Sequence, residues 1–265
     1  IAARPDQGFY GFDGFDWDIE GNDTPSSPYN EFTVACLDLM GEISKYAKAD
    51  GYIVTMAPAE SYIDPTRNGF DRSLRHEYEE WIGIIPSFPY HGLNAYAYLL
   101  NKYAKTETIV KDELTGALVS TLVPTFDWIM IQLYEGYSHA EYNITQAGEK
   151  PWDVLIKFVQ LITTGWEIQY SNDQELHYPN QYLNIESDRL LIGLANGWAG
   201  DGKFLLIYPD EINIAYQQLK EMNLAPRGFG FWDIADEGKA SVLRPNEPVW
   251  LASGLNKILK IRNNN

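Results

Sequence analysis

Three carboxylates alternate with large apolar residues in a short stretch near the start of the chain. Asp16, Asp18 and Glu20 lie two residues apart, with an aromatic or aliphatic residue in each gap. Because side chains of an extended strand alternate between its two faces, the three acids share one face at a spacing of about 7 Å. Like charges at that spacing raise the pKa of at least one carboxyl, which suits a general acid beside an ionised partner.

Two other readings of this stretch are open. An ordinary half-exposed strand would also alternate, with its acids facing water. Against this reading stand the glycines that flank or interrupt the run, since glycine marks places where backbone or ligand approaches closely; they are Gly11, Gly14 and Gly21. A calcium loop would also gather acids, but the EF-hand pattern needs a flexible loop with a central glycine rather than alternating large hydrophobic residues.

The four acids Asp13, Asp16, Asp18 and Glu20 resemble the DxxDxDxE motif of family 18 glycoside hydrolases, the chitinases and their relatives. The resemblance implies that the motif ends the fourth strand of a (β/α)8 barrel. It also implies that Glu20 is the general acid, that Asp18 steers the N-acetyl group of the substrate, and that Asp16 tunes Asp18. Asp13 completes the candidate set, but it is out of phase with the other acids and we expect it to hold backbone rather than substrate.

Three later segments are similar to further strands of that family. VTMAP with Met56 is similar to the fifth strand, MIQLY with Met130, Gln132 and Tyr134 to the sixth, and GFGFWD with Trp232 to the eighth. The resemblance implies that Tyr134 bonds the acetamido oxygen and that Trp232 stacks under the sugar ring. Gln132, Met130 and Met56 are candidates for lining the pocket. On composition alone, Tyr134 and Trp232 are equally compatible with roles in the core.

Alternating strand and helix patterns predict an α/β fold with a parallel sheet. The resemblance implies that residues 1–265 belong to a single barrel domain. Residues 59–125 form an enlarged excursion between two barrel strands, placed to build a wall of the site. The predicted strands are 12–20, 52–57, 128–134, 190–195 and 228–233. The predicted helices are 30–49, 93–105, 111–119, 151–164, 210–222 and 248–261.

Two features depart from the family pattern. Glu135 follows the sixth-strand tyrosine, where many relatives have asparagine. Only eleven residues precede Phe12, too few for the three βα units that should come before the fourth strand. We therefore expect this sequence to cover about strands 4 to 8 of a longer chain, with a separate or missing N-terminal segment, or a strand-swapped partner, completing the barrel.

Composition narrows the partners. A net charge of −17 argues against nucleic acid and anionic membranes as partners, because both would be repelled. It does not affect binding of a neutral polysaccharide. We expect no metal, because the four histidines lack metal-ligand spacing, and no cofactor, because no phosphate-binding or zinc motif is present. Cys36 stands alone, so no disulfide can form within the chain. Secretion is expected from the substrate class and from sequons at Asn22 and Asn143.

The function that the resemblance implies is hydrolysis of chitin and related β-1,4-linked N-acetylglucosamine oligosaccharides, with the substrate's own acetamido group assisting. One alternative is a non-catalytic lectin of the same fold that binds chitin or its oligosaccharides. Such relatives typically lose the general acid, whereas Glu20 is present here. The other alternative is an endo-β-N-acetylglucosaminidase acting on N-glycans, which would share all of these motifs.

Overall fold

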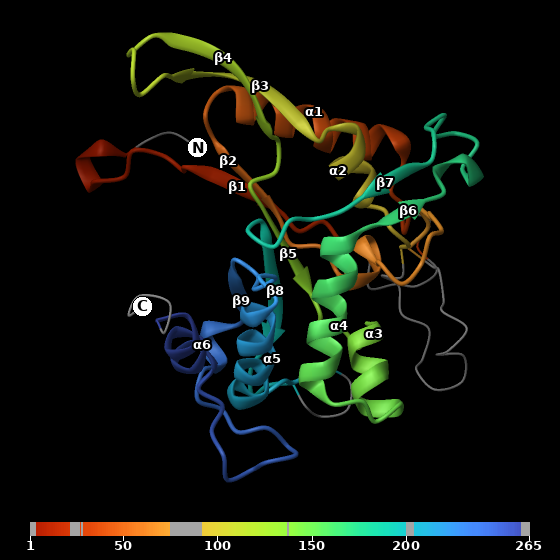
Figure 1. Cartoon of the computed structure of the whole chain (residues 1–265), viewed down its shortest axis with the longest axis vertical. Helices are drawn as coiled ribbons and strands as arrows, with labels where there is room; N and C mark the ends of the chain where they lie inside the picture. Colours follow the sequence, from red (N-terminus) through yellow and green to blue (C-terminus); the bar gives the residue numbers. More distant parts are fainter. Residues whose placement is uncertain are drawn as a thin grey trace.

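The computed structural model describes residues 4–21, 27, 29–74, 92–136, 138–199 and 204–260. Their central feature is a five-stranded sheet with the order β1-β2-β5-β8-β9, in which every neighbouring pair is parallel (Figure 1). Its strands are β1 (Gly14–Trp17), β2 (Ile53–Met56), β5 (Trp128–Gln132), β8 (Leu190–Ala195) and β9 (Gly228–Trp232). The α/β fold with a parallel sheet is thus confirmed. Since β1 and β9 lie at opposite edges of this sheet, a closed eight-stranded barrel stays a prediction.

Four helices connect or follow these strands: α1 (Val34–Ala49), α4 (Pro151–Thr164), α5 (Pro209–Glu221) and α6 (Leu251–Lys260). Helices α1 and α5 pack on one face of the sheet. Trp17 of β1 donates through Nε1 to Ser44 of α1 at 2.8 Å, and Phe229 of β9 lies 5.8 Å from the ring of Tyr216 on α5. Side chains alternate between the two faces of a strand, so Asp16, which directly precedes Trp17, points to the opposite face.

The boundaries of several predicted elements agree with the structure, including those of α4 and β8. The helix predicted from residue 30 begins later, at Val34, because the Thr33 hydroxyl accepts the amide of Cys36 at 3.1 Å and caps the helix there. The helix predicted over 93–105 is reduced to α2 (Ala97–Lys102).

The helix predicted over 111–119 is wrong, because this segment forms the turn of a hairpin. The hairpin pairs β3 (Lys105–Lys111) with β4 (Leu118–Pro124) and extends alongside α1 (Figure 1). In the turn, the Asp112 carboxylate accepts the amide and hydroxyl of Thr115, both at 2.7 Å, and Gly116 adopts a φ of 71°. Side-chain bonds of this kind favour a turn over a helix.

Shorter elements complete the described chain. A second hairpin pairs β6 (Trp166–Ile168) with β7 (Gln181–Leu183). The others are η1 (Pro5–Gln7), η2 (Glu60–Ile63), α3 (His139–Glu141), η4 (Tyr142–Gln146), η5 (Tyr170–Asn172) and η6 (Ile234–Asp236). No helix in the described ranges combines the length and the apolar character needed to cross a bilayer.

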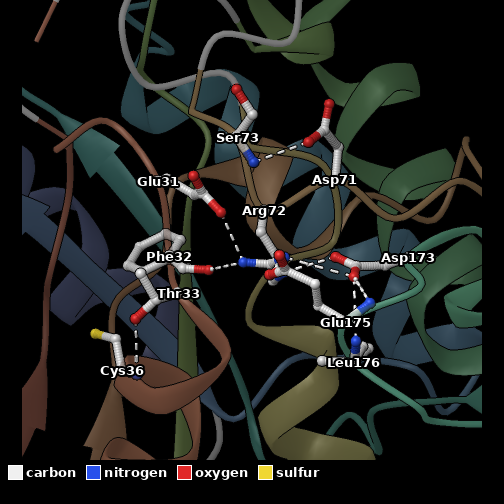
Figure 2. Close-up of polar contacts among 10 residues, drawn as sticks. All are labelled: Glu31, Phe32, Thr33, Cys36, Asp71, Arg72, Ser73, Asp173, Glu175 and Leu176. Carbon is white, nitrogen blue, oxygen red and sulfur yellow. Dashed lines mark hydrogen bonds and ion pairs between the residues drawn. The ribbon is translucent and has the colours of Figure 1, made fainter. Parts of the chain in front are cut away.

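A buried arginine ties the excursion 59–125 to distant segments (Figure 2). Arg72 donates to Asp173 at 2.5 Å, to Glu31 at 2.8 Å, to Glu175 at 2.9 Å and to the Phe32 carbonyl at 3.0 Å. These partners come from the connection between β1 and α1 and from the segment after η5. A guanidinium carries five N–H donors and can bond several acceptors at once. Arg72 therefore fixes this part of the excursion against the rest of the fold. Residues 75–91 of the excursion lie outside the described residues.

Candidate functional site

The acidic stretch lies at an edge of the sheet, and β1 is shorter than predicted. Asp16 lies within β1, whereas Asp18 and Glu20 follow its carboxyl end. Asp16 pairs in register with Thr55 of β2, and the Thr55 hydroxyl donates to its carboxylate. Asp16 and Thr55 therefore share the face that points away from the helices. The carboxyl ends of parallel strands are where α/β proteins carry their sites.

Gln132 at the end of β5 holds the Asp18 carboxylate. Its Nε2 atom donates to Asp18 Oδ1 at 2.9 Å and to the carbonyl oxygen of Ala57 at 2.5 Å. Gln132 is buried, and β2 lies between β1 and β5 in the sheet. The amide thus uses both of its hydrogens to fix Asp18 across the intervening strand.

The pKa values of Asp16 and Asp18 are both raised in the site. Partial removal of water raises the pKa of Asp16, with a contribution from the charge of Asp18, although the bond from Thr55 opposes the rise. Desolvation also raises the pKa of Asp18 against the opposing bond from Gln132. Both side chains still reach solvent. Such a group of acids can keep one carboxyl protonated near neutral pH while another stays charged.

Glu135, the departure noted in the sequence, belongs to the same cluster. Burial raises the pKa of Glu135 to about 8, and the charges of Glu20 and Asp18 add to the effect. Burial together with Glu135, Asp18 and Glu20 also raises the pKa of the neighbouring Tyr134. Side chains from the ends of β1 and β5 therefore converge, and Glu135 is a member that the sequence identified only as an exception.

Tyr96, which precedes α2, fixes the backbone between Asp18 and Glu20. Its hydroxyl donates to the Ile19 carbonyl at 2.8 Å and accepts the Ile19 amide at 3.0 Å. The Tyr96 side chain is fully buried, and this desolvation raises its pKa, so the hydroxyl stays neutral. The excursion thus positions the acids through one tyrosine, a role that the sequence did not reveal.

Tyr96→Phe is expected to lower the free energy of unfolding by about 1–3 kcal/mol, because it leaves the amide and carbonyl of Ile19 without this partner. Tyr216→Phe is the matched control. Among the described residues the buried Tyr216 hydroxyl has no hydrogen-bond partner, so its removal should cost little. Denaturant unfolding of the two variants measures the difference. Equal losses would show that the bonds to Ile19 contribute nothing to stability.

Three aromatic residues border the site beyond Gln132. Tyr134 meets Trp198 edge to face at 6.2 Å between ring centroids, and Trp198 donates through Nε1 to the Trp232 carbonyl at 2.6 Å. Asn196 donates to the Asp233 carbonyl at 2.5 Å, which holds the backbone just after β9. Trp232 is 61% exposed at the end of β9. An open aromatic ring there provides a platform on which a flat apolar face can stack.

The structure brings Met130 into the same face but not Met56 or Asp13. A side chain at Gly230 would overlap the sulfur of Met130, so glycine leaves the room that Met130 occupies. Met56 pairs with Trp17 on the helix-covered face and is fully buried in the core. Its neighbour Thr55 faces the site, and adjacent residues of a strand point to opposite faces, so Met56 points away from the site. Asp13 precedes β1, at the opposite end from Glu20, where its carbonyl accepts the Ile53 amide at 2.8 Å.

Two of the four histidines fall within the described residues, and two fall outside them. His139 is buried beside Asp64, with Nδ1 at 3.1 Å from Oδ2, and His177 is exposed. His76 and His91 fall outside the described ranges, as does the sequon at Asn22, whereas Asn143 lies in η4. Within the described ranges, no group of three or more His, Cys, Asp or Glu side chains is arranged to hold a metal ion.

No protein-family model matches the chain, and no curated protein matches it. Among solved structures, it is similar to a chitinase from Aspergillus fumigatus with a TM-score of 0.42 and 14% identity, over 95% of this chain and 59% of that one. It is also similar to a fungal endo-beta-N-acetylglucosaminidase from glycosyl hydrolase family 18, with a TM-score of 0.42 and 12% identity, over 93% of this chain and 56% of that one. The chain therefore spans less than two thirds of either structure, and similarity at this level establishes neither a family nor an activity.

Proposed function

We propose that this protein hydrolyses chitin and related β-1,4-linked N-acetylglucosamine oligosaccharides. One observation carries the proposal: Gln132 holds the Asp18 carboxylate at 2.9 Å, two residues before Glu20 and at the carboxyl end of a parallel sheet. The spacing of Asp13, Asp16, Asp18 and Glu20 resembles the motif of family 18 glycoside hydrolases and supports the same conclusion. A polymeric substrate of this kind also favours secretion.

In the proposed reaction Glu20 protonates the glycosidic oxygen, and the substrate's acetamido carbonyl attacks the anomeric carbon. Asp18 accepts the acetamido N–H and stabilises the positive charge of the cyclic intermediate. Asp16 tunes Asp18 through a shared proton or a hydrogen bond, and the charge of Asp18 contributes to the raised pKa of Asp16. Water then opens the intermediate with Glu20 as base, and the product retains its configuration.

Two aromatic side chains are assigned to the sugar at the cleavage point. Tyr134 bonds the acetamido oxygen, and its neutral hydroxyl suits a donor, since burial and nearby acids raise its pKa. Trp232 stacks under the ring, with the exposed face that stacking requires. Gln132 acts through Asp18 in this scheme, whereas Met130 contributes only to the shape of the pocket.

We also propose that further β/α units complete an eight-stranded barrel along the outer edge of β1, which pairs only with β2 among the described residues. Helix α1 carries exposed apolar side chains at helical spacing, Leu39, Ile43 and Tyr46. A helix normally buries such a stripe against a neighbour. An open edge strand likewise presents unpaired backbone groups. The units belong either to the same polypeptide or to a separate one, and the single-domain organisation of 1–265 rests on them.

A substrate panel tests the proposed activity on the native protein as isolated. It should cleave chitin oligosaccharides and release products of β-configuration, measured by chromatography and proton NMR. Release of glycans from a high-mannose glycoprotein, with chitin oligosaccharides left intact, would replace this assignment with an endo-β-N-acetylglucosaminidase. Binding of chitin oligosaccharides without any cleavage would replace it with a lectin.

A further inference from the structure

A cavity lies where the loop after β9 crosses the beginnings of α5 and α6. Its volume is about 360 Å³, within the range of small-molecule sites. The side chains used in the argument are Tyr208, Asp210, Arg244, Glu247, Trp250 and Lys257. Since α5 and α6 each follow a strand of the sheet, their first residues lie towards the carboxyl ends of those strands. The cavity therefore lies towards the same end of the sheet as the acid cluster.

Trp250 is a fixed and exposed platform at this cavity. Its ring rests on Gly238, where an added Cβ would lie 2.6 Å from the ring, and Gly238 has a φ of 85° that favours glycine. Two segments of the loop are held together there by backbone hydrogen bonds. The Gly238 amide donates to the Val249 carbonyl at 3.0 Å, and the Val249 amide donates to the Lys239 carbonyl at 2.9 Å. Trp250 is nonetheless 57% exposed.

The charged groups around Trp250 balance one another. Asp210 and Glu247 offset Arg244 and Lys257, although the whole chain carries a net charge of −17. The Arg244 guanidinium lies 3.7 Å from the centre of the Tyr208 ring and 3.6 Å from Glu247. Donors and acceptors beside a flat apolar ring, with no excess charge, suit an uncharged ligand with many hydroxyl groups.

We propose that this cavity is a second carbohydrate-binding site, in which one pyranose ring of a polysaccharide stacks on Trp250. The loop that carries it starts at Trp232 and ends at Trp250, so two exposed tryptophans frame one segment. The site retains a long chain near the acid cluster and does not contact short oligosaccharides bound there. The sugar class, β-1,4-linked N-acetylglucosamine, rests on the proposed function.

Trp250→Ala tests this site in the native protein. The variant should lose about tenfold or more in affinity for insoluble chitin, as expected when a central aromatic anchor is removed. Its turnover of a short chromogenic N-acetylglucosamine oligosaccharide should match the wild type. Trp250→Tyr should recover much of the binding. Tyr182→Ala, which removes an exposed aromatic side chain on β7, should bind as the wild type does.

The outcomes separate this site from the proposed activity. Unchanged chitin binding by Trp250→Ala, or no chitin binding by the wild type, would overturn the second site even if short substrates are cleaved. Binding that depends on Trp250 in a protein without turnover would support the second site and overturn the proposed hydrolysis. A parallel loss of binding and of short-substrate turnover in Trp250→Ala would show that Trp250 belongs to the acid site itself.

Discussion

Glu20→Gln is expected to abolish the turnover of chitin oligosaccharides and to leave their binding nearly intact. The amide has almost the shape of the carboxyl but cannot give a proton to the glycosidic oxygen. General acid catalysis contributes about 10²–10⁴-fold, and we expect a loss towards the upper end of this range because the leaving sugar is a poor leaving group without protonation. Asp18 should keep its bond from Gln132 in the variant, and Trp232 should keep its exposed ring. Steady-state kinetics and titration calorimetry measure the two effects.

Asp13→Asn is the matched control for this loss. It makes the same carboxyl-to-amide change within the same motif, but Asp13 precedes β1 and contributes its backbone carbonyl to the pairing with Ile53. Its turnover should therefore stay close to that of the wild type. Turnover retained in Glu20→Gln would remove Glu20 from the role of acid. A joint loss of turnover and binding would instead indicate that the substitution had disturbed the site.

Local sequence patterns predicted the elements whose signals are strong. Helix α4 has a proline at its first position and a regular apolar stripe, and β8 is an uninterrupted apolar run; both have the predicted bounds. The hairpin of β3 and β4 was missed because its turn depends on the Asp112 carboxylate. Competition between side-chain bonds and helix formation is hard to weigh from sequence. The sequence therefore predicts the layered architecture better than it predicts the excursion.

The sequence predicted which strands carry the candidate site, but not the contacts between residues of different strands. Alternation placed Asp16 and Asp18 on one face, but register between strands decides that Thr55 bonds Asp16 and that Gln132 reaches Asp18. Tyr96 lies 77 positions from Ile19 in the chain, and no local pattern connects them. The structure likewise places Met56, a candidate for lining the pocket, on the opposite face of the sheet. Long-range pairing carries this information, whereas periodicity does not.

A buried acid beside the site makes the stability of the fold depend on pH. Glu60 follows β2, is 2% exposed, and accepts the Ala140 amide at 3.2 Å. Burial raises the pKa of Glu60 to about 7, against the opposing effect of His139. Desolvation lowers the pKa of His139, but the hydrogen bond and charge of Asp64, with the charge of Glu60, outweigh it and raise the pKa overall.

The sign of the pH effect follows from these two shifts. The folded-state pKa of Glu60 lies above the unfolded value of about 4.3, so between the two the folded protein binds more protons than the unfolded chain. Its favourable effect is complete below the unfolded pKa and is lost as pH rises through about 7. The raised pKa of His139 acts in the same direction, because stabilisation by its charged form disappears above its folded pKa. The fold should therefore be more stable at pH 5 than at pH 8.5.

Glu60→Gln is expected to reduce this pH dependence, because the buried amide never ionises. The difference in unfolding free energy between pH 5 and pH 8.5 should shrink by roughly 3 kcal/mol, which corresponds to roughly 5–10 °C in melting temperature for a chain of this size. Calorimetry at the two pH values measures it. Glu42→Gln, at an exposed position of α1, should keep the wild-type pH dependence. If Glu60→Gln keeps the wild-type pH dependence as well, the loss of stability at high pH must come from other groups, such as Glu135, whose pKa is also raised.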